Sequence, residues 1–362
     1  MQVFSSRCDS VLSCKRVWVY NTYGKSCVIS KDKSRKGGGE MSGWTRKMVC
    51  AGAMAMACCA GAAPKPAIIS TDIGDDIDDT WAISLALKCP ELDVKLIVGD
   101  YGNAEARARL IAKILETDKR TDVAVGVGVH AGAKDGLHRQ STWIEGYELK
   151  NYPGKVYPDG VQALIDIVMA SKEPVTLICI GPTPNIAEAL KREPRIAEKA
   201  RFVGMYGSVR LGYGHNAKPC PEWNVKAAPA ACRAALTAPW DATITPLDTC
   251  GLIQLKGEKY ARLRASNDLV VRTLLKNYRV WRANHAKDHI ETDTETASTT
   301  LFDCVAVYLA CSQDLCTMEK LGIRVTDDGL TVEDPAAKKI NVATAWKDLP
   351  AFETWLVDRL CK

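Results

Sequence analysis

The chain has 362 residues, of which 47% are hydrophobic and 25% charged, a composition typical of a folded protein with a sizeable core rather than a disordered one. The formal net charge is only +5, and the basic residues near the N-terminus lack interleaved aromatic residues, so the charge pattern does not indicate a nucleic-acid partner. Six of the 15 cysteines lie at or before Cys59, and the rest include no CxxC pair, which argues against a zinc site and a disulfide scaffold.

The N-terminal region divides into two segments. Residues 1–40 are polar and non-periodic, and we interpret them as a mis-called or disordered extension. Residues 41–63 have the order of a signal peptide, with positive residues, a short apolar run that ends at Cys59, and small residues after it. This pattern predicts a secreted or periplasmic protein that starts at Met41. The alternative is a disordered tail and an Ala-rich helix on a cytoplasmic protein. Export would permit one or two disulfides, but the spacing defines no pairing.

From residue 67 onward, short β-branched runs alternate with longer helical patterns. The expected strands span residues 67–71, 94–98, 123–127, 175–180 and 202–205. The expected helices span residues 77–88, 104–116, 161–170 and 186–191. This alternation predicts βαβ units, and therefore an α/β fold with a doubly wound, mostly parallel sheet flanked by helices. We expect residues 64–362 to form a single large domain.

The last third of the chain has a different pattern. We expect a long helix over residues 269–286, a helix over 305–311, a pair of strands near 322–325 and 340–342, and a closing helix over 352–360.

An acidic loop follows the first expected strand. Five aspartates, at positions 72, 75, 76, 78 and 79, lie within eight residues, and such a density of like charge is unfavourable unless a cation neutralises it. Oxygen ligands without His or Cys favour Ca²⁺ or Mg²⁺. An EF-hand counted from Asp72 would need Gly and Glu where Ile77 and Ile83 stand, and a dehalogenase-type phosphatase would need Asp in place of Ser70. Some of these aspartates could instead simply cap the following helix.

The loop Asp72-Ile-Gly-Asp-Asp-Ile-Asp-Asp79 resembles a longer form of the DTDxGxDD loop of the inosine-uridine preferring nucleoside hydrolase family. Further segments resemble the family's motifs in the family's order, and an ordered set is far more specific than one motif. They are Tyr101-Gly-Asn103, Gly181-Pro-Thr-Pro-Asn185, Met205-Tyr-Gly207, Asn216 with Pro221-Glu-Trp-Asn224, Pro246-Leu-Asp248, Leu301-Phe-Asp303 and Gly329-Leu-Thr-Val332.

The resemblance implies a calcium-dependent glycosidase that hydrolyses the N-glycosidic bond of a ribonucleoside through an oxocarbenium-like transition state. It implies Ca²⁺ ligands at Asp72, Asp79, Asp303 and the carbonyl of Pro184, with Asp72 as the base that activates a metal-bound water. The residues that it implies for the ribose are Asp78 and Asn103 at the 2′ and 3′ hydroxyls, and Asn216, Glu222 and Asn224 at the 5′ side.

The sequence departs from the family where the leaving base would be assisted. Phe302 stands where many members carry a His that acts as general acid, so we consider His285 and His289 as substitutes. Stacking of the base on Trp223, Tyr206 or Trp281 is the other route. Ser70, in place of the family's leading Asp, removes a hydrogen bond behind the site.

Two alternatives from other classes stay open. The first is a secreted, calcium-dependent ribose- or nucleoside-binding protein with weak or no hydrolase activity, suggested by Phe302. The second is a structural protein that uses the acidic loop for calcium-dependent stability. We expect a small-molecule nucleoside as partner, no nucleic acid and no membrane span, and the resemblance implies a homo-oligomer, either a dimer or a tetramer.

Overall fold

The computed structural model describes residues 17–20, 26–29, 63–132, 139–284 and 293–362. The chain divides into two units, Met1–Gly61 and Ala62–Lys362. In the first unit, β1 (Val17–Tyr20) pairs antiparallel with β2 (Ser26–Ile29). The predicted signal peptide lies outside the described residues, except for Ala63.

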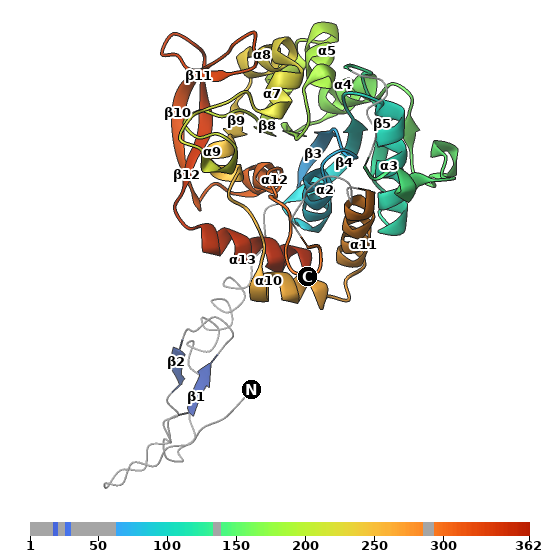
Figure 1. The fold of residues 1–362 in the computed structure, drawn as a ribbon, viewed down its shortest axis with the longest axis vertical. Helices are drawn as coiled ribbons and strands as arrows, with labels where there is room; N and C mark the ends of the chain where they lie inside the picture. Colours follow the sequence, from blue (N-terminus) through green and yellow to red (C-terminus); the bar gives the residue numbers. More distant parts are fainter. Residues whose placement is uncertain (1–16, 21–25, 30–62, 133–138, 285–292) are drawn as a thin grey trace, which may run out of the picture. The chain divides into compact units, whose positions relative to one another are not determined.

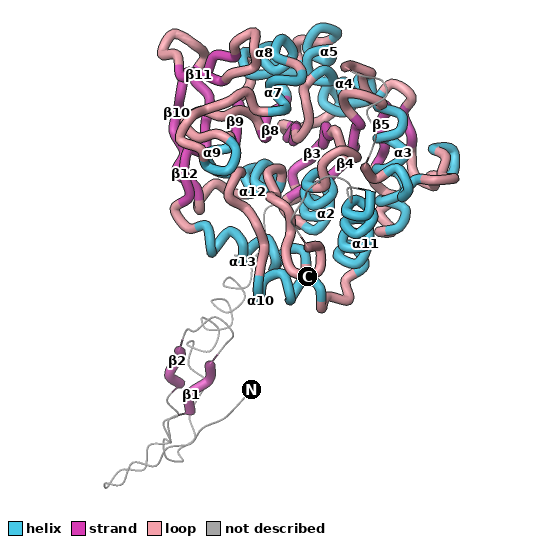
Figure 2. The backbone as a smooth tube through the Cα atoms, viewed as in Figure 1, coloured by secondary structure: helices cyan, strands magenta, loops and turns pink. Residues whose placement is uncertain are grey.

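The second unit contains a ten-stranded sheet whose order is β11-β10-β12-β9-β8-β7-β3-β4-β5-β6 (Figures 1 and 2). The strands from β6 to β12 in this order run parallel, and β10 and β11 are added antiparallel at one edge. The strands are β3 (Lys65–Thr71), β4 (Leu92–Gly99), β5 (Ala124–Val127), β6 (Val156–Tyr157), β7 (Val175–Cys179), β8 (Ala200–Met205), β9 (Ala242–Thr245), β10 (Cys316–Val325), β11 (Thr331–Glu333) and β12 (Lys339–Trp346).

Helices cover both faces of this sheet (Figure 1). The α-helices are α2 (Asp78–Lys88), α3 (Ala104–Thr117), α4 (Gly160–Ala170), α5 (Pro184–Arg192), α6 (Ile196–Lys199), α7 (Trp223–Ala227), α8 (Pro229–Thr237), α9 (Leu247–Cys250), α10 (Gly257–Arg264), α11 (Leu269–Asn284), α12 (Cys304–Cys311) and α13 (Leu349–Leu360). Short 3-10 helices span Ser141–Ile144, Leu149–Asn151 and Tyr213–His215.

The core consists of two apolar clusters, one on each face of the sheet. Alternate residues of β3 divide between them, since Ala67 and Ile69 belong to one cluster and Ile68 to the other. This division explains why Ala67, Ile68 and Ile69 in the middle of the strand are all apolar rather than alternating with polar residues. The predicted doubly wound α/β fold is therefore confirmed for residues 62–362.

The order of the strands reverses between β3 and β7. From β3 the chain fills the sheet through β4, β5 and β6, and it then returns to the other side of β3 with β7. Loops at such a reversal separate at the carboxyl ends of the strands and leave a crevice between them. The acidic loop follows β3 at this point, so the topology itself places it at the edge where a ligand can enter.

Directly after the two strands, at the base of the crevice, the backbones of the loops after β3 and β7 still touch each other. A Cβ atom on Gly181 would lie 2.6 Å from the backbone nitrogen of Asp72, a distance that no other residue tolerates. The glycine of the Gly181-Pro-Thr-Pro-Asn185 segment is therefore required by backbone packing against the acidic loop.

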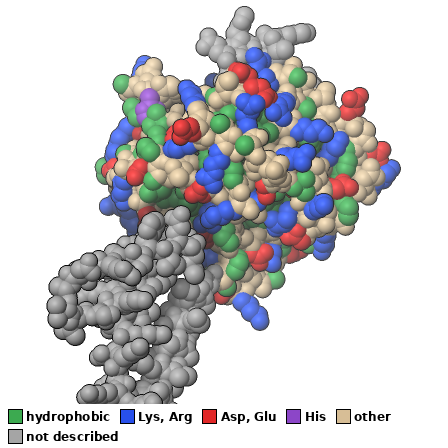
Figure 3. Space-filling view, turned by 90° about the horizontal axis from the view of Figure 1, so that it is seen from below, with side chains coloured by type: hydrophobic (Ala, Val, Ile, Leu, Met, Phe, Trp, Pro, Cys, Tyr) green, Lys and Arg blue, Asp and Glu red, His purple; other side chains and the backbone are tan. Residues whose placement is uncertain are grey.

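Charged side chains of both signs lie on the face of the molecule drawn in Figure 3. On the face drawn in Figure 3, Lys and Arg side chains are interspersed with Asp and Glu, as expected for a solvated surface. Within the described part of the chain, no helix is both long and apolar enough to cross a membrane.

The helix that carries the acidic residues depends on one large aromatic side chain. Trp81 on α2 is fully buried, and its ring lies 6.0 Å from that of Tyr278 and 6.5 Å from that of Tyr260. We expect Trp81→Ala to lower the free energy of unfolding by about 4 kcal/mol, because it removes a buried indole and leaves a cavity. Denaturant unfolding measures this change.

Trp223→Ala is the matched control, because the Trp223 side chain is 52% exposed and its loss should change the free energy of unfolding by less than about 0.5 kcal/mol. Similar losses in the two variants would contradict this account of the core.

Candidate active site

A pocket of about 620 Å³ opens at the carboxyl ends of β3, β4, β7 and β8. All five aspartates of the acidic loop line it. Asp303, which immediately precedes α12, joins them from more than 200 residues further along the chain. The pocket therefore gathers the acidic residues that the sequence pattern predicted for a metal site.

Three carboxylates converge most closely. An oxygen of each of Asp78, Asp79 and Asp303 lies within 4.8 Å of the others, and all three side chains are buried. Asp78 and Asp79 form the first turn of α2, and Asp303 is the residue before α12. The N-termini of two helices thus point their partial positive charge at this cluster.

The buried carboxylates raise one another's pKa values. Burial is the largest cause for Asp78, Asp79 and Asp303, and repulsion from the neighbouring carboxylates adds to it, so that all three pKa values lie well above the usual range. Helix ends offset only part of this repulsion. Carboxylate oxygens in this number and arrangement fit a hard divalent cation, which would neutralise the cluster.

Asp72 lies beside the cluster rather than within it. Its side chain is 7% exposed and lines the pocket. Burial raises the pKa of Asp72 to about 6, and the nearby Arg107 guanidinium opposes that increase. Asp72 also raises the pKa values of Asp78, Asp79 and Asp303, so the four carboxylates form one interacting group.

Arg107 is a site residue that the sequence pattern did not reveal. Its side chain, 1% exposed, donates Nη1 to the carbonyl oxygens of Asp72 and, at 2.9 Å, Ile73. Nε donates to the carbonyl of Tyr101 at 2.8 Å, and Nη2 pairs with the Asp75 carboxylate at 2.9 Å. One guanidinium therefore fixes the loops after β3 and β4 together, and Asp75 acquires the role of its partner.

A second unpredicted residue, Asp100, compensates for Ser70. The Ser70 hydroxyl donates to Asp100 Oδ2 at 2.9 Å, and the Asn185 amide donates to Ser70 Oγ at 3.1 Å. Asp100 is fully buried, and burial raises its pKa to about 8. A carboxyl group thus still lies behind Asp72, but it comes from the end of β4. Its place among the polar residues after a strand was the available signal.

The residues expected at the sugar divide into two sets. Glu222 and Asn224 are buried and line the pocket. Glu222 accepts from the backbone N–H groups of Gly207 at 2.9 Å and of Asn224 at 2.7 Å, and it caps α7. Burial raises the pKa of Glu222 to about 7. The Asn224 amide donates to the Met205 carbonyl at 3.1 Å, so both side chains are held rigidly at the pocket wall.

The other set lies outside the pocket lining. Asn103 caps α3 by accepting from Ala106 N at 3.1 Å, and Asn216 is exposed and accepts from Lys218 N at 3.0 Å. Pro184, expected to bind the metal through its carbonyl, also lies outside the lining and is half-buried at the first position of α5. In this structure these three residues serve local turns and helix ends.

Aromatic side chains form the open end of the pocket. Trp223 and Tyr213 are 52% and 44% exposed, and Phe302 is half-buried. The rings of Tyr213 and Phe302 meet edge to face at 6.0 Å, and Tyr213 Oη accepts from Trp223 N at 3.0 Å. Tyr213 is the third unpredicted member of the site, and its position before Asn216 carried no distinguishing signal.

The remaining expected contacts lie elsewhere. Tyr206 is fully buried and donates its hydroxyl to the Gly181 carbonyl at 2.6 Å. Trp281 is 1% exposed, and its Nε1 donates to the Asp75 carbonyl at 2.9 Å. Both therefore support the loops of the site from behind instead of facing a ligand. His285 and His289 lie outside the described residues.

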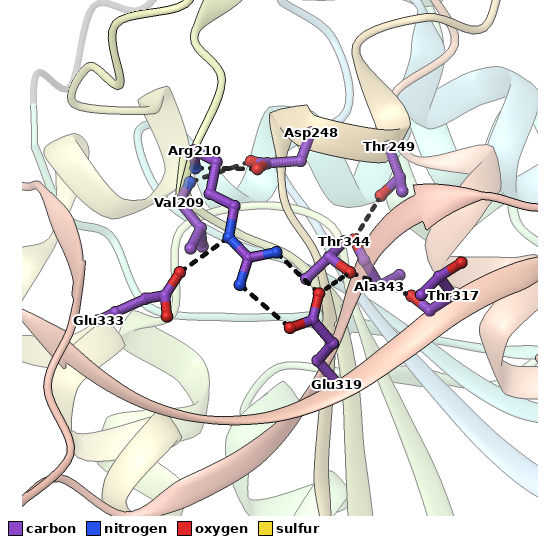
Figure 4. A network of polar contacts seen from close by, with 9 residues as sticks. All are labelled: Val209, Arg210, Asp248, Thr249, Thr317, Glu319, Glu333, Ala343 and Thr344. Atoms are coloured by element: carbon purple, nitrogen blue, oxygen red, sulfur yellow. Dashed lines mark hydrogen bonds and ion pairs between the residues drawn. The ribbon is translucent and has the colours of Figure 1, made fainter.

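The loop that carries Tyr213 is fastened to the antiparallel edge of the sheet (Figure 4). Asp248 accepts from the backbone nitrogens of Val209 at 3.0 Å and Arg210 at 2.8 Å. The Arg210 side chain pairs with Glu319 of β10 at 2.7 Å and with Glu333 of β11 at 2.9 Å. The Pro246-Leu-Asp248 segment thus has a structural role, because it shapes the loop above the pocket.

A protein-family model described as inosine-uridine preferring nucleoside hydrolase matches residues 67–353. The chain belongs to this family. The curated relatives of this nucleoside hydrolase include uridine nucleosidase 1 of Arabidopsis thaliana, which is 26% identical over 311 residues that cover 80% of this chain and 88% of the relative. Pyrimidine-specific ribonucleoside hydrolase RihA of Enterobacter sp. (strain 638) is 30% identical over 58% of this chain and 68% of the relative.

Solved structures share the fold. The purine-preferring ribonucleoside hydrolase from Gardnerella vaginalis is 26% identical, with a TM-score of 0.68 over 82% of this chain and 98% of that chain. The plant nucleoside hydrolase PpNRh1 has a TM-score of 0.69 over 82% of this chain and 99% of that chain, and at 22% identity it supports the fold alone.

Family membership confirms the predicted enzyme class. The chain is a glycosidase that hydrolyses the N-glycosidic bond of nucleosides. The alternative of a binding protein is not favoured, since the relatives and the solved structures are hydrolases.

The role of Arg107 in joining the site loops is open to a direct test. We expect Arg107→Gln to lower the free energy of unfolding by about 3 kcal/mol, because buried carbonyl groups and the Asp75 carboxylate lose their donor. Denaturant unfolding, measured without added cation, gives this value.

Arg195→Gln is the control, since Arg195 is 66% exposed and pairs with Glu193 at the surface. This variant should lower the free energy of unfolding by less than about 1 kcal/mol. Equal stability losses in the two variants would mean that Arg107 does not hold the loops.

Proposed function

We propose that this nucleoside hydrolase cleaves ribonucleosides with the help of Ca²⁺, using Asp72 as the base that accepts a proton from the attacking water. The observation that carries the proposal is the convergence of Asp78, Asp79 and Asp303 within 4.8 Å, with Asp72 beside them in the same pocket. Calcium-dependent hydrolysis needs both of these features, namely a cluster that holds the ion and a further carboxylate that accepts a proton.

The residues present fit a calcium ion. Asp79 and Asp303, which the sequence pattern proposes as ligands, belong to the convergent cluster together with Asp78, and Asp72 lines the same pocket. Ca²⁺ accepts six to eight oxygen ligands in flexible geometry, which suits a cluster of buried carboxylates better than the strict octahedron of Mg²⁺. A bound Ca²⁺ would supply the positive charge that lowers the pKa of water and holds the ribose hydroxyls.

The chain's own residues would orient the sugar. We assign the 2′ and 3′ hydroxyls to Asp78 and the 5′ side to Glu222 and Asn224, all three of which line the pocket. The hydrogen bonds that fix Glu222 and Asn224 pre-organise this wall, so little freedom is lost when a substrate binds. Asn103 and Asn216 stay predictions for the same sugar contacts, from outside the pocket lining.

The leaving base would meet the aromatic end of the pocket. Trp223, Tyr213 and Phe302 present ring faces and edges on which a base can stack. The relatives carry names that include both uridine and purine nucleosides, so the substrate panel should contain both classes.

We also propose that the protein is exported, with Met41 as the first residue of a signal peptide. The order of charge, apolar run and small residues in 41–63 supports this. N-terminal sequencing of the mature protein, with a start after about residue 62, would agree with it.

The role of Asp72 predicts a loss of catalysis without a loss of fold. We expect Asp72→Asn to lower kcat by about 10³-fold on uridine or inosine, because the water loses its proton acceptor. Base release measured by absorbance or chromatography gives the rate. Asp93→Asn, at an exposed surface carboxylate, is the control with unchanged rate. Full activity in Asp72→Asn would eliminate Asp72 as the base.

Binding of the cation should stabilise the fold by an amount that depends on pH. The fold raises the pKa of Asp72 from 3.8 to about 6, so without a cation stability falls as the pH rises through that range. Protons and Ca²⁺ compete for these carboxylates, and CaCl₂ should therefore raise the melting temperature more at pH 8 than at pH 5. Calcium at 100 times its Kd should add about 2.7 kcal/mol to the free energy of unfolding.

Thermal unfolding with CaCl₂, with MgCl₂ and with EDTA measures this effect. Asp303→Asn is the control variant, because it removes a buried ligand and should abolish the calcium response. A calcium-induced rise in melting temperature that persists in Asp303→Asn would contradict the assignment of a calcium site. A larger rise with Mg²⁺ than with Ca²⁺ would contradict it as well.

Replacing Phe302 by His should increase the hydrolytic activity. We expect Phe302→His to raise kcat on inosine by about tenfold or more, since an imidazole at this position can protonate the leaving base. The added acid should also appear as a new falling limb of the kcat profile above about pH 6.5. Phe302→Leu separates the imidazole from the loss of the ring. A kcat that is no higher in Phe302→His than in Phe302→Leu would show that stacking, not an acid, assists the base.

A further inference from the structure

A second cluster of ligating side chains lies away from the pocket. One ligating atom each of Cys89, Glu91 and Cys311 lies within 4.8 Å of the others. Cys89 is 3% exposed, and Cys311 is half-buried. The spacing of the cysteines along the sequence defined no pairing, whereas the fold brings these two side by side.

The two cysteines occupy equivalent places on two neighbouring helices. Cys89 directly follows α2 as its C-cap residue, and Cys311 is the last residue of α12. The two helices contact each other directly. Their opposite ends carry the carboxylate cluster, with Asp78 and Asp79 on α2 and Asp303 before α12. The thiols thus lie at one end of the helix pair, and the carboxylate cluster lies at the other end.

We propose that Cys89 and Cys311 form a redox-sensitive pair that closes into a disulfide between α2 and α12. The oxidant is a small-molecule disulfide. The more accessible Cys311 attacks one of its sulfurs and releases one thiol, and Cys89 then attacks Cys311 Sγ and releases the second. Two cysteine thiols are oxidised, the oxidant is reduced to two thiols, and the cysteine protons pass to those thiols.

The surroundings of the thiols favour this order of events. A hydrogen bond with the Cys311 side chain, and burial, raise the pKa of the Cys89 thiol, so Cys89 is the poorer first nucleophile. The Cys89 sulfur lies within 4.8 Å of Cys311 Sγ, where it can act second.

The same cluster suits a metal less well. A structural zinc site needs four ligands, and the described residues supply three. One oxygen of the Glu91 carboxylate, Oε1, is also paired with Arg359 from α13. A disulfide uses only the two sulfurs and leaves this ion pair intact.

The experiment uses the full chain and does not rest on the proposed catalytic function. Purified protein is incubated with oxidised glutathione or with dithiothreitol, the remaining free thiols are alkylated after denaturation, and the disulfide-linked peptides are identified by mass spectrometry. Trypsin releases Cys89 on residues 89–95, but residues 288–320 contain Cys304, Cys311 and Cys316 together. Chymotrypsin, which cleaves after Tyr308 and Leu315, separates Cys311 from the other two.

We expect a peptide that links Cys89 to Cys311 in the oxidised sample only, and a melting temperature higher by roughly 5 °C, because the bond closes a loop of about 220 residues. The Cys311→Ser variant should lose both changes, and Cys361→Ser, at another half-buried cysteine, should keep them. Recovery of Cys89 and Cys311 as alkylated thiols after oxidation would overturn the proposal, as would their linkage to other cysteines. Stoichiometric Co²⁺ binding with thiolate charge-transfer absorption, lost in Cys311→Ser, would equally overturn it in favour of a metal site.

Discussion

The concentration of buried negative charge beside β3 is the constraint on which the rest of the structure depends. Asp72, Asp78, Asp79 and Asp303 are all buried, and repulsion from Asp72 raises the pKa values of the other three. A folded protein tolerates such a group only when positive charge surrounds it. Here the chain supplies the Arg107 guanidinium and the N-termini of α2 and α12, and a divalent cation would supply the rest.

This constraint explains features of the fold that packing alone does not require. The N–H groups of Arg107 donate to carbonyl groups and to Asp75. The guanidinium is therefore a fixed local counter-charge and does not extend to a ligand. The helices that present the carboxylates, α2 and α12, are buried almost all round, which prevents the cluster from spreading apart. The repulsion within the site is therefore balanced by hydrophobic packing behind it.

Much of the fold was predictable, because β3 to β8 follow a regular alternation of β-branched and helical patterns. The two-residue β6 was missed because so short a run carries no periodicity, and β9 was missed as well, although β5, of the same length, was predicted. In the site, the carboxylates were predictable because they lie in ordered motifs. Arg107 and Asp100 were not, because their roles arise from contacts between loops that follow different strands. Trp281 differs in the other direction. It was expected to contact the leaving base, whereas its indole N–H donates to the Asp75 carbonyl behind the site.

The two halves of the pocket obey different physical rules. Around the metal-type site Asp72, Asp78, Asp79 and Asp303 are all buried, so a substitution there leaves an uncompensated charge or an orphaned polar group. At the aromatic end, Trp223 and Tyr213 are about half exposed, and exchanging them costs the fold little. Relatives with this fold bear names for uridine, pyrimidine or purine nucleosides. Such variation is expected if the fold fixes the metal and sugar chemistry, while choice of base rests on side chains that the core does not constrain.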